Sequence, residues 1–403
     1  MSIDIDNRKV LIIGAGSTGL ALAQGLKMKG IPFTVYDRDA SPEARERNWS
    51  FGLHWGIEPL RGLVPAHIYA QLEAAQVDPH IDLDDPVTNR MPLHNGATGD
   101  LIMDIQFAKI YRLRRDKFRA MLLTDLADAE VQWGKELANI TYSPDGAIVT
   151  ATFTDGTSDT GAILIGADGA HSKTRTLLLG SEKAKVTPIG FASTMCFTRH
   201  TRERALFLRA PPHHPLYQAG PHPDGYSAWL GLQNGEDKDH PENWVFFQFI
   251  SYPEPRDEIN TRTDEELVRH VKDLARGFAD PWRSAFEWMS DGTPVWYSKL
   301  RNWDPSLPGH RWENQRGRVT LAGDAAHPMT FQRGQGVNHA VLDAGRVCEA
   351  LGAVWGGLTV EGREGAVKGF EEEMVRRSGE EVRASEANSV LLHDWSRLVG
   401  VRE

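Results

Sequence analysis

Three features are scarce in this sequence, and each scarcity excludes a class of protein. The 403 residues include only two cysteines, both in apolar stretches, so the chain is not a small secreted domain held by disulfides and suits a reducing compartment. No apolar run approaches the roughly 20 residues that a membrane-spanning helix needs. The sequence has no long basic run and its formal net charge is −10, which argues against nucleic acid as the main partner.

The beginning of the chain and its histidines exclude two further classes. The first ten residues, MSIDIDNRKV, are polar and acidic, unlike a signal peptide, and we expect a soluble, cytoplasmic protein. The length suits two closely joined domains. His213, His214 and His222 lie in a Pro- and Gly-rich segment without a carboxylate or a helical i, i+4 spacing, so we predict no metal site.

A complete βαβ pattern occupies residues 9–39. The apolar run VLII predicts a buried parallel strand, and it leads into the glycine pattern of Gly14, Gly16 and Gly19. A helical repeat and a second strand follow, and Asp37 ends that strand. Glycines allow a tight turn, close approach of a pyrophosphate to a helix N-terminus and close helix–strand packing, while the acid can accept hydrogen bonds from a ribose. The pattern predicts a dinucleotide site but leaves NAD, NADP and FAD open.

Two later stretches each place an acidic residue at the end of an apolar strand. Residues 162–175, AILIGADGAHSKTR, carry Asp168 and Gly169, and residues 318–328, RVTLAGDAAHP, carry Gly323 and Asp324. Either one alone is as consistent with an ordinary turn as with a binding site.

Together, in this order and spacing, the three stretches resemble the single-component flavin-dependent aromatic hydroxylases, which are built like p-hydroxybenzoate hydroxylase. The chain looks most like the fungal members of secondary metabolism. The resemblance spans residues 9 to about 350 and implies FAD as the cofactor, with the first motif on its ADP half. It also assigns cofactor contacts to Asp168, Gly169, Gly323, Asp324, Arg38, Arg47 and Arg115, with Arg114 able to share the role of Arg115.

The same resemblance gives a role to the segment after Asp324. Gly334, Gly336, Val337 and Asn338 would form the loop and first turn of a helix whose N-terminus points at the flavin ring and stabilises the negative charge of the reduced ring. Where many relatives have a proline, this chain has Phe331. We expect Phe331 and Gln332 to shape an enlarged substrate pocket.

The resemblance further implies the reaction. NADPH or NADH would reduce the flavin and leave, oxygen would add at flavin C4a, and the hydroperoxide would oxygenate a bulky, electron-rich molecule (aromatic, indole or polyene) in a dry pocket. His54 is our candidate to meet the substrate or flavin N5, although a histidine satisfied within the core is as plausible. Arg199 could steady a phenolate or enolate, and a surface charge is the plainer reading of it.

The expected fold is α/β: a Rossmann-like FAD-binding domain with a parallel sheet, joined to an antiparallel-sheet substrate domain. We assign residues 1–183 and 295–365 to the first domain, 184–294 to the second and 366–403 to a C-terminal helical segment, with 76–110 able to contribute to the substrate side. Many tryptophans lie in or near the second domain, and we expect two or three to touch ligand and the rest to be core.

Other functions are less consistent with the sequence. An NAD-dependent dehydrogenase would share only the first motif, and a flavin-dependent halogenase would carry a W-x-W-x-I-P stretch, which the sequence lacks. Three cofactor motifs disfavour a pure binding protein. The remaining alternative is an FAD enzyme of the same fold with a non-oxygenating role, such as a cyclase, isomerase, oxidase or dehydrogenase. The sequence leaves the substrate, the choice of NADH or NADPH and the oligomeric state undetermined.

Overall fold

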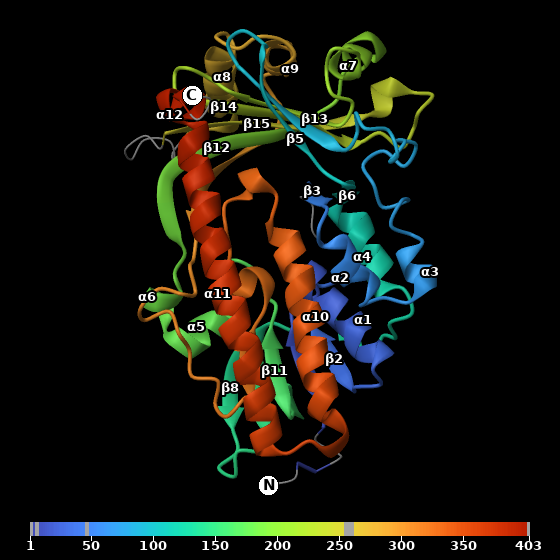
Figure 1. Ribbon diagram of the computed structural model, residues 1–403, viewed down its shortest axis with the longest axis vertical. Helices are drawn as coiled ribbons and strands as arrows, with labels where there is room; N and C mark the ends of the chain where they lie inside the picture. The colour runs from blue at the N-terminus through green and yellow to red at the C-terminus, as the bar shows by residue number, and fades with distance from the viewer. Residues whose placement is uncertain (1–2, 5–7, 45–47, 254–261, 401–403) are drawn as a thin grey trace.

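Two sheets at opposite ends of the molecule, bridged by one long helix, define the fold (Figure 1). The structure is a computed structural model and describes residues 3–4, 8–44, 48–253 and 262–400. No helix in these ranges is both long and apolar enough to cross a membrane. The predicted α/β fold, with one parallel and one largely antiparallel sheet, is confirmed.

The first sheet is parallel, and its five strands have the order β17-β11-β1-β2-β7. Its central strands are wholly apolar and buried because protein covers both faces. The strands are β17 (Val319–Leu321), β11 (Ile163–Gly166), β1 (Val10–Ile13), β2 (Phe33–Tyr36) and β7 (Val131–Gln132).

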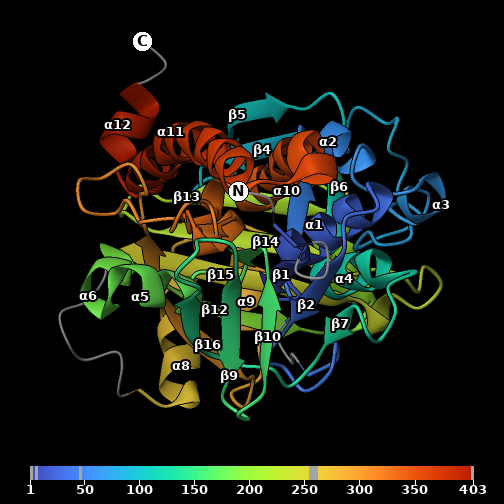
Figure 2. The same cartoon turned by 90° about the horizontal axis from the view of Figure 1, so that it is seen from below.

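Different layers cover the two faces of this sheet (Figure 2). Helices pack on one face in a single apolar core: α1 (Ser17–Met28), α4 (Arg115–Leu123), α10 (Gly336–Val354) and α11 (Val360–Leu392). A small antiparallel sheet packs on the other: β8 (Leu137–Tyr142), β9 (Val149–Phe153) and β10 (Ser158–Gly161). Helix α1 ends where Gly30 takes a φ of +65°, as expected for a C-terminal glycine.

The second sheet has seven strands in the order β16-β12-β15-β14-β13-β4-β5, and all neighbours are antiparallel except β13 and β4. Two of its strands come from within residues 76–110. Helices α8 (Asp264–Ala275) and α9 (Trp282–Glu287) cover one face. The strands are β16 (Val295–Asn302), β12 (Thr187–Thr198), β15 (Val245–Pro253), β14 (Ser227–Asn234), β13 (Tyr217–Pro221), β4 (Arg90–His94) and β5 (Leu101–Gln106).

A two-stranded ribbon lies between the seven-stranded sheet and helices α2 (Ile57–Arg61) and α4 (Figure 1). It pairs β3 (Ser50–Leu53) with β6 (Tyr111–Arg114) in antiparallel register. The other elements lie around the two sheets: α3 (Ala66–Tyr69), α5 (Lys173–Leu179), α6 (Ser181–Ala184), α7 (Arg202–Arg209), α12 (Trp395–Gly400) and short 3₁₀ turns that include η4 (Gly323–Ala325) and η5 (Phe331–Arg333).

Helix α11 connects the two ends of the molecule. Near its start the fully buried Arg363 donates five hydrogen bonds to four backbone carbonyls, those of Gly146, Ala147, Ala162 and Arg316, at 2.6–3.2 Å. Near its end, apolar side chains of α11 and α12 pack on β4 and β5. The helix begins at Val360, so the expected domain boundary at residue 365 falls inside it.

Replacing Arg363 tests this anchor. We expect Arg363→Met to lower the free energy of unfolding by about 3 kcal/mol, because buried carbonyls would lose their donors. Urea unfolding measures the loss. Arg376, which is exposed on the same helix, is the matched control, and Arg376→Met should change stability by less than about 0.5 kcal/mol. Equal effects of the two substitutions would contradict an anchoring role.

Candidate functional site

Three backbone segments meet at the carboxyl ends of β1, β11 and β17, and glycines make the contact possible. Gly14 has a φ of +109°, and a Cβ there would lie 2.5 Å from the carbonyl oxygen of Ala167. A Cβ on Gly19 would lie 1.9 Å from the carbonyl oxygen of Gly14, and one on Gly323 2.3 Å from Oγ1 of Thr18. The three sequence motifs therefore form one site.

Two other glycines of the site face open space. Gly16 is the N-cap residue of α1, and among the described residues nothing lies within 4 Å of where its Cβ would be. The same holds for Gly169, whose φ is +80°. No side chain caps α1 in the described part of the chain, and its first turn contains no acidic residue. A helix N-terminus with these properties can bind a pyrophosphate.

Asp37 fastens the first glycine turn. Its carboxylate is buried and accepts hydrogen bonds from the backbone N–H groups of Ala15, at 2.7 Å, and of Asp39, at 2.9 Å. Arg119, which the sequence reasoning missed, donates to the carbonyl oxygen of Ala15 at 3.0 Å from α4. Arg38 beside Asp37 is exposed. Arg47 lies outside the described residues.

Asp168 holds its own loop together. Its carboxylate accepts hydrogen bonds from Oγ of Ser172, at 2.6 Å, and from the N–H of Thr174, at 2.9 Å. Arg175, a second residue that the sequence reasoning did not single out, ties this loop to the third motif. It donates to the carbonyls of Ala170 and Ala325 at 2.6 and 2.8 Å.

Asp324 is exposed in η4 and points toward the start of α10. Its Oδ1 lies 3.7 Å from where a Cβ on Gly336 would be. The protein packed around the Asp324 carboxylate raises its pKa by desolvation, whereas electrostatic interactions with His327, Arg115 and Arg175 oppose that rise. Asp324 and Arg115, which are far apart in sequence, are therefore brought to the same site.

A buried ionic cluster supports the third motif from behind, and the sequence reasoning missed it. Asp343 on α10 accepts hydrogen bonds from the N–H of Gly323 at 2.8 Å, from Nε2 of His327 at 2.6 Å and from Arg377 of α11 at 2.6 Å. Burial alone would raise the pKa of Asp343, but His327 and Arg377 outweigh it and lower the pKa to about 2. The feature of the sequence that could have revealed this cluster is the position of Asp343 within the apolar stripe of α10.

The start of α10 is fixed to the ribbon by Asn338. Its side-chain oxygen accepts from the N–H groups of His54 and Gly56, both at 3.0 Å, and its side-chain nitrogen donates to the carbonyl of Gly52 at 3.0 Å. The amide thus serves the protein backbone. Gly334 has a φ of +64°, the left-handed conformation that glycine takes readily. Val337 is half-buried against the helical core.

The two candidate catalytic residues occupy different places. His54 is half-buried beside Phe107, with ring centroids 5.1 Å apart, and burial lowers its pKa to about 4. It is therefore neutral at pH 7 and can accept a proton. Arg199 is exposed just beyond the end of β12, and in the described residues no hydrogen bond, ion pair or ring contact joins it to the other candidates.

The face of the seven-stranded sheet not covered by α8 and α9 is rich in aromatic side chains. We call it the aromatic face, and it consists of Phe197, Tyr217, Trp229, Phe247, Phe249 and Trp296. Phe331 of η5 meets it edge-on, with its ring 5.2 Å from that of Phe249, and remains 42% exposed. Gln332 beside it hydrogen-bonds Ser389 of α11 and, at 3.4 Å, Ser251 of β15. The loop that precedes α10 therefore contacts the sheet directly.

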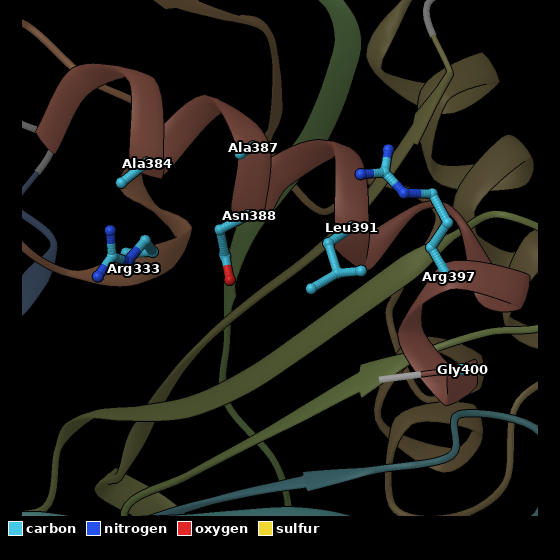
Figure 3. Close-up of a pocket in the computed structure, with 7 residues that line it drawn as sticks. All are labelled: Arg333, Ala384, Ala387, Asn388, Leu391, Arg397 and Gly400. Carbon is cyan, nitrogen blue, oxygen red and sulfur yellow. The ribbon is translucent and has the colours of Figure 1, made fainter. Parts of the chain in front are cut away.

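A separate open cavity of about 640 Å³ lies where α11, α12 and η5 meet (Figure 3). None of the catalytic candidates lines it. Its lining consists of Arg333, Ala384, Ala387, Asn388, Leu391, Arg397 and Gly400. Among the described residues no group of three or more His, Cys, Asp or Glu side chains could hold a metal ion. His214 and His222 instead hydrogen-bond the carbonyls of Val87 and Gly277.

Comparisons with known proteins agree on the cofactor. Residues 94–377 match the family described as FAD binding domain. The FAD-dependent monooxygenase cctM of Talaromyces islandicus is 37% identical over 98% of this chain and 95% of its own length. The FAD-dependent monooxygenase phnB of Penicillium herquei is 35% identical over 96% of this chain and 92% of its own. A Klebsiella pneumoniae HpxO structure, complexed with FAD and uric acid, shares the fold with a TM-score of 0.73 at 21% identity, covering 98% of this chain and 91% of that one.

Substituting Gly14 tests the convergence of the motifs. Gly14→Ala should weaken FAD binding by about tenfold or more, because a side chain at this φ is strained and would collide with Ala167. The ratio of bound flavin absorbance to protein after gel filtration gives the result. Gly345→Ala on α10, where the described residues leave space for a Cβ, is the control and should retain FAD. Full FAD content in Gly14→Ala would contradict the close approach.

Proposed function

Because this chain belongs to the family of FAD-dependent monooxygenases, we propose that it uses NADPH or NADH and O₂ to oxygenate a bulky, electron-rich aromatic, indole or polyene molecule of secondary metabolism. The reaction transfers one oxygen atom to the substrate and reduces the other to water with the two electrons of NAD(P)H. The observation that supports this proposal is the aromatic face of the substrate sheet, contacted by Phe331 from the loop that precedes α10.

The residues fit FAD at each part of the cofactor. Gly16 and the uncapped start of α1 would take the pyrophosphate, Asp37 the ribose, and Asp324 with Arg115 the ribityl chain. The N-terminus of α10 would point at the flavin ring and stabilise its negative charge. Bound FAD would supply reduction by NAD(P)H and activation of O₂.

The protein itself would bind, orient and shield the substrate. The aromatic face would give an apolar surface on which a conjugated molecule stacks and from which water is excluded. His54 would accept the proton of a substrate hydroxyl, which makes the ring more electron-rich. Asn338 positions His54 by holding its backbone N–H against α10.

Turnover of the purified holoenzyme tests the proposed reaction. With an accepted substrate, NADPH or NADH oxidation and O₂ consumption should both rise, and ¹⁸O₂ should place one labelled atom in the product. The candidate substrates to be tested are conjugated phenols with increasing numbers of rings. Substrate conversion with no O₂ consumed would instead favour a cyclase or isomerase, and label released only as hydrogen peroxide would favour an oxidase.

His54 gives a second prediction. If it accepts the substrate proton, His54→Asn should lower kcat by about 10²- to 10⁴-fold. In the pH profile of the unsubstituted enzyme, kcat/KM should decline on the acid side at about pH 4. Burial lowers the pKa of His54 to about 4, and protonation below that pH removes the base. His67→Asn, at an exposed histidine, should change neither quantity. An acid limb near pH 6.5 would contradict the assignment.

A further inference from the structure

Arg112 is an unusual cation in this structure. It lies on β6 of the ribbon, opposite Gly52 of β3, and faces away from the core that Tyr111 and Leu113 enter. Among the described residues its side chain has no hydrogen-bond or ion-pair partner, and its Nε is buried without an acceptor. Leaving a buried charge unpaired is costly.

Two fully buried arginines show how a guanidinium group finds hydrogen-bond acceptors in this protein. Arg363 donates to four carbonyls. Arg175 donates to the carbonyls of Ala170, Ala184 and Ala325. Both serve to join backbone segments. Arg112 joins none, so its cationic head is available for something other than the chain itself.

Arg112 points at the aromatic face. Its guanidinium carbon lies 5.4 Å from the ring centre of Trp229 and 5.7 Å from that of Tyr217, and these two rings stack on each other. Burial raises the pKa of Tyr217 to about 12, so this phenol is neutral and does not neutralise the cation. Burial lowers the pKa of Arg112 to about 10, which leaves it charged at pH 7.

A second unsatisfied donor lies at the same place. The Nε1–H of Trp229 is buried and has no acceptor in the described part of the chain. It lies over Gly231, where a Cβ would approach it to 2.9 Å. The sheet register puts Trp229 opposite Phe249, whose ring contacts Phe331. The guanidinium of Arg112 and the indole N–H of Trp229 therefore lie beside the part of the aromatic face that contacts the loop preceding α10.

We propose that Arg112 and the indole N–H of Trp229 form an anion subsite that binds the carboxylate or ionised hydroxyl of a conjugated aromatic substrate stacked on the aromatic face. This inference rests on the proposed function and adds its substrate class: an acidic aromatic molecule. A charged pair with the guanidinium and a hydrogen bond from the indole would satisfy both orphaned donors.

Binding measurements on the FAD-loaded enzyme test the subsite without turnover. The probes are three acid and amide pairs of increasing size: benzoate and benzamide, 1-naphthoate and 1-naphthamide, and 9-anthroate and its amide. Changes in the flavin spectrum report the dissociation constants at pH 7.5. We expect at least one acid to bind more tightly than its amide, and Arg112→Met to weaken that acid about ten- to hundredfold while changing the amide less than about twofold.

Further variants separate charge, hydrogen bonding and folding. Arg112→Lys keeps the charge and should recover part of the preference for the acid. Trp229→Phe keeps a ring and loses the N–H, so it should weaken the acid more than the amide. Arg204, an exposed arginine stacked 4.8 Å over Trp288, is the matched control, and Arg204→Met should leave both constants unchanged.

Three results would overturn the subsite. These are no preference for any acid in the unsubstituted enzyme, an equal loss of acid and amide in Arg112→Met, and a lowered FAD content in that variant, which would make Arg112 a cofactor residue. Failure of the proposed monooxygenase reaction is distinguishable, because it would show as absent O₂ consumption while the binding preference stands.

Discussion

The close approach of three backbone segments is the constraint on which the rest of the structure depends. Gly14, Gly19 and Gly323 let the turns after β1 and β17, the loop after β11 and the start of α1 meet without side chains between them. This contact fixes the N-terminus of α1 and, through the hydrogen bond from Gly323 to Asp343, the position of α10. Because α10 carries Asn338, the ribbon and His54 are placed by the same contact.

Buried polar side chains transmit this order outward from the glycine contact. Asp343 lies between the third motif and Arg377 of α11, and Arg175 lies between the second and third motifs. Asp343 is bonded to a residue more than 30 positions away in the sequence, and Arg175 to one more than 100 positions away. In the unfolded chain, water would make hydrogen bonds to the same polar groups. Buried charges with complete sets of partners define one arrangement well, since a shifted backbone would leave them unpaired.

Local patterns in the sequence predicted those parts of the molecule that local chemistry determines. The run VLII, the glycines after it and the helix that follows identified β1 and α1 closely, and the order of three motifs indicated the family and FAD. The sequence did not reveal the roles of Asp343, Arg175 and Arg119. Each contacts a carbonyl, an N–H group or a charge that only the tertiary fold brings close. The prediction that Asn338 contacts the cofactor stays a prediction, but its hydrogen bonds to the backbone of Gly52, His54 and Gly56 were not predicted. These contacts could not be predicted because Asn338 and Gly52 are far apart in the sequence.

Helix α11 also has a mechanical consequence. Its 33 residues make a rod of about 50 Å at 1.5 Å per residue. Arg363 is locked into the parallel-sheet end, and His393, just past the other end of the rod, hydrogen-bonds Ser251 of β15 at 2.9 Å and stacks on Phe191. The rod therefore keeps a fixed gap between the two sheets along one side of the molecule. Any motion that changes the distance between the two sheets would therefore pivot about the side of the molecule along which α11 runs.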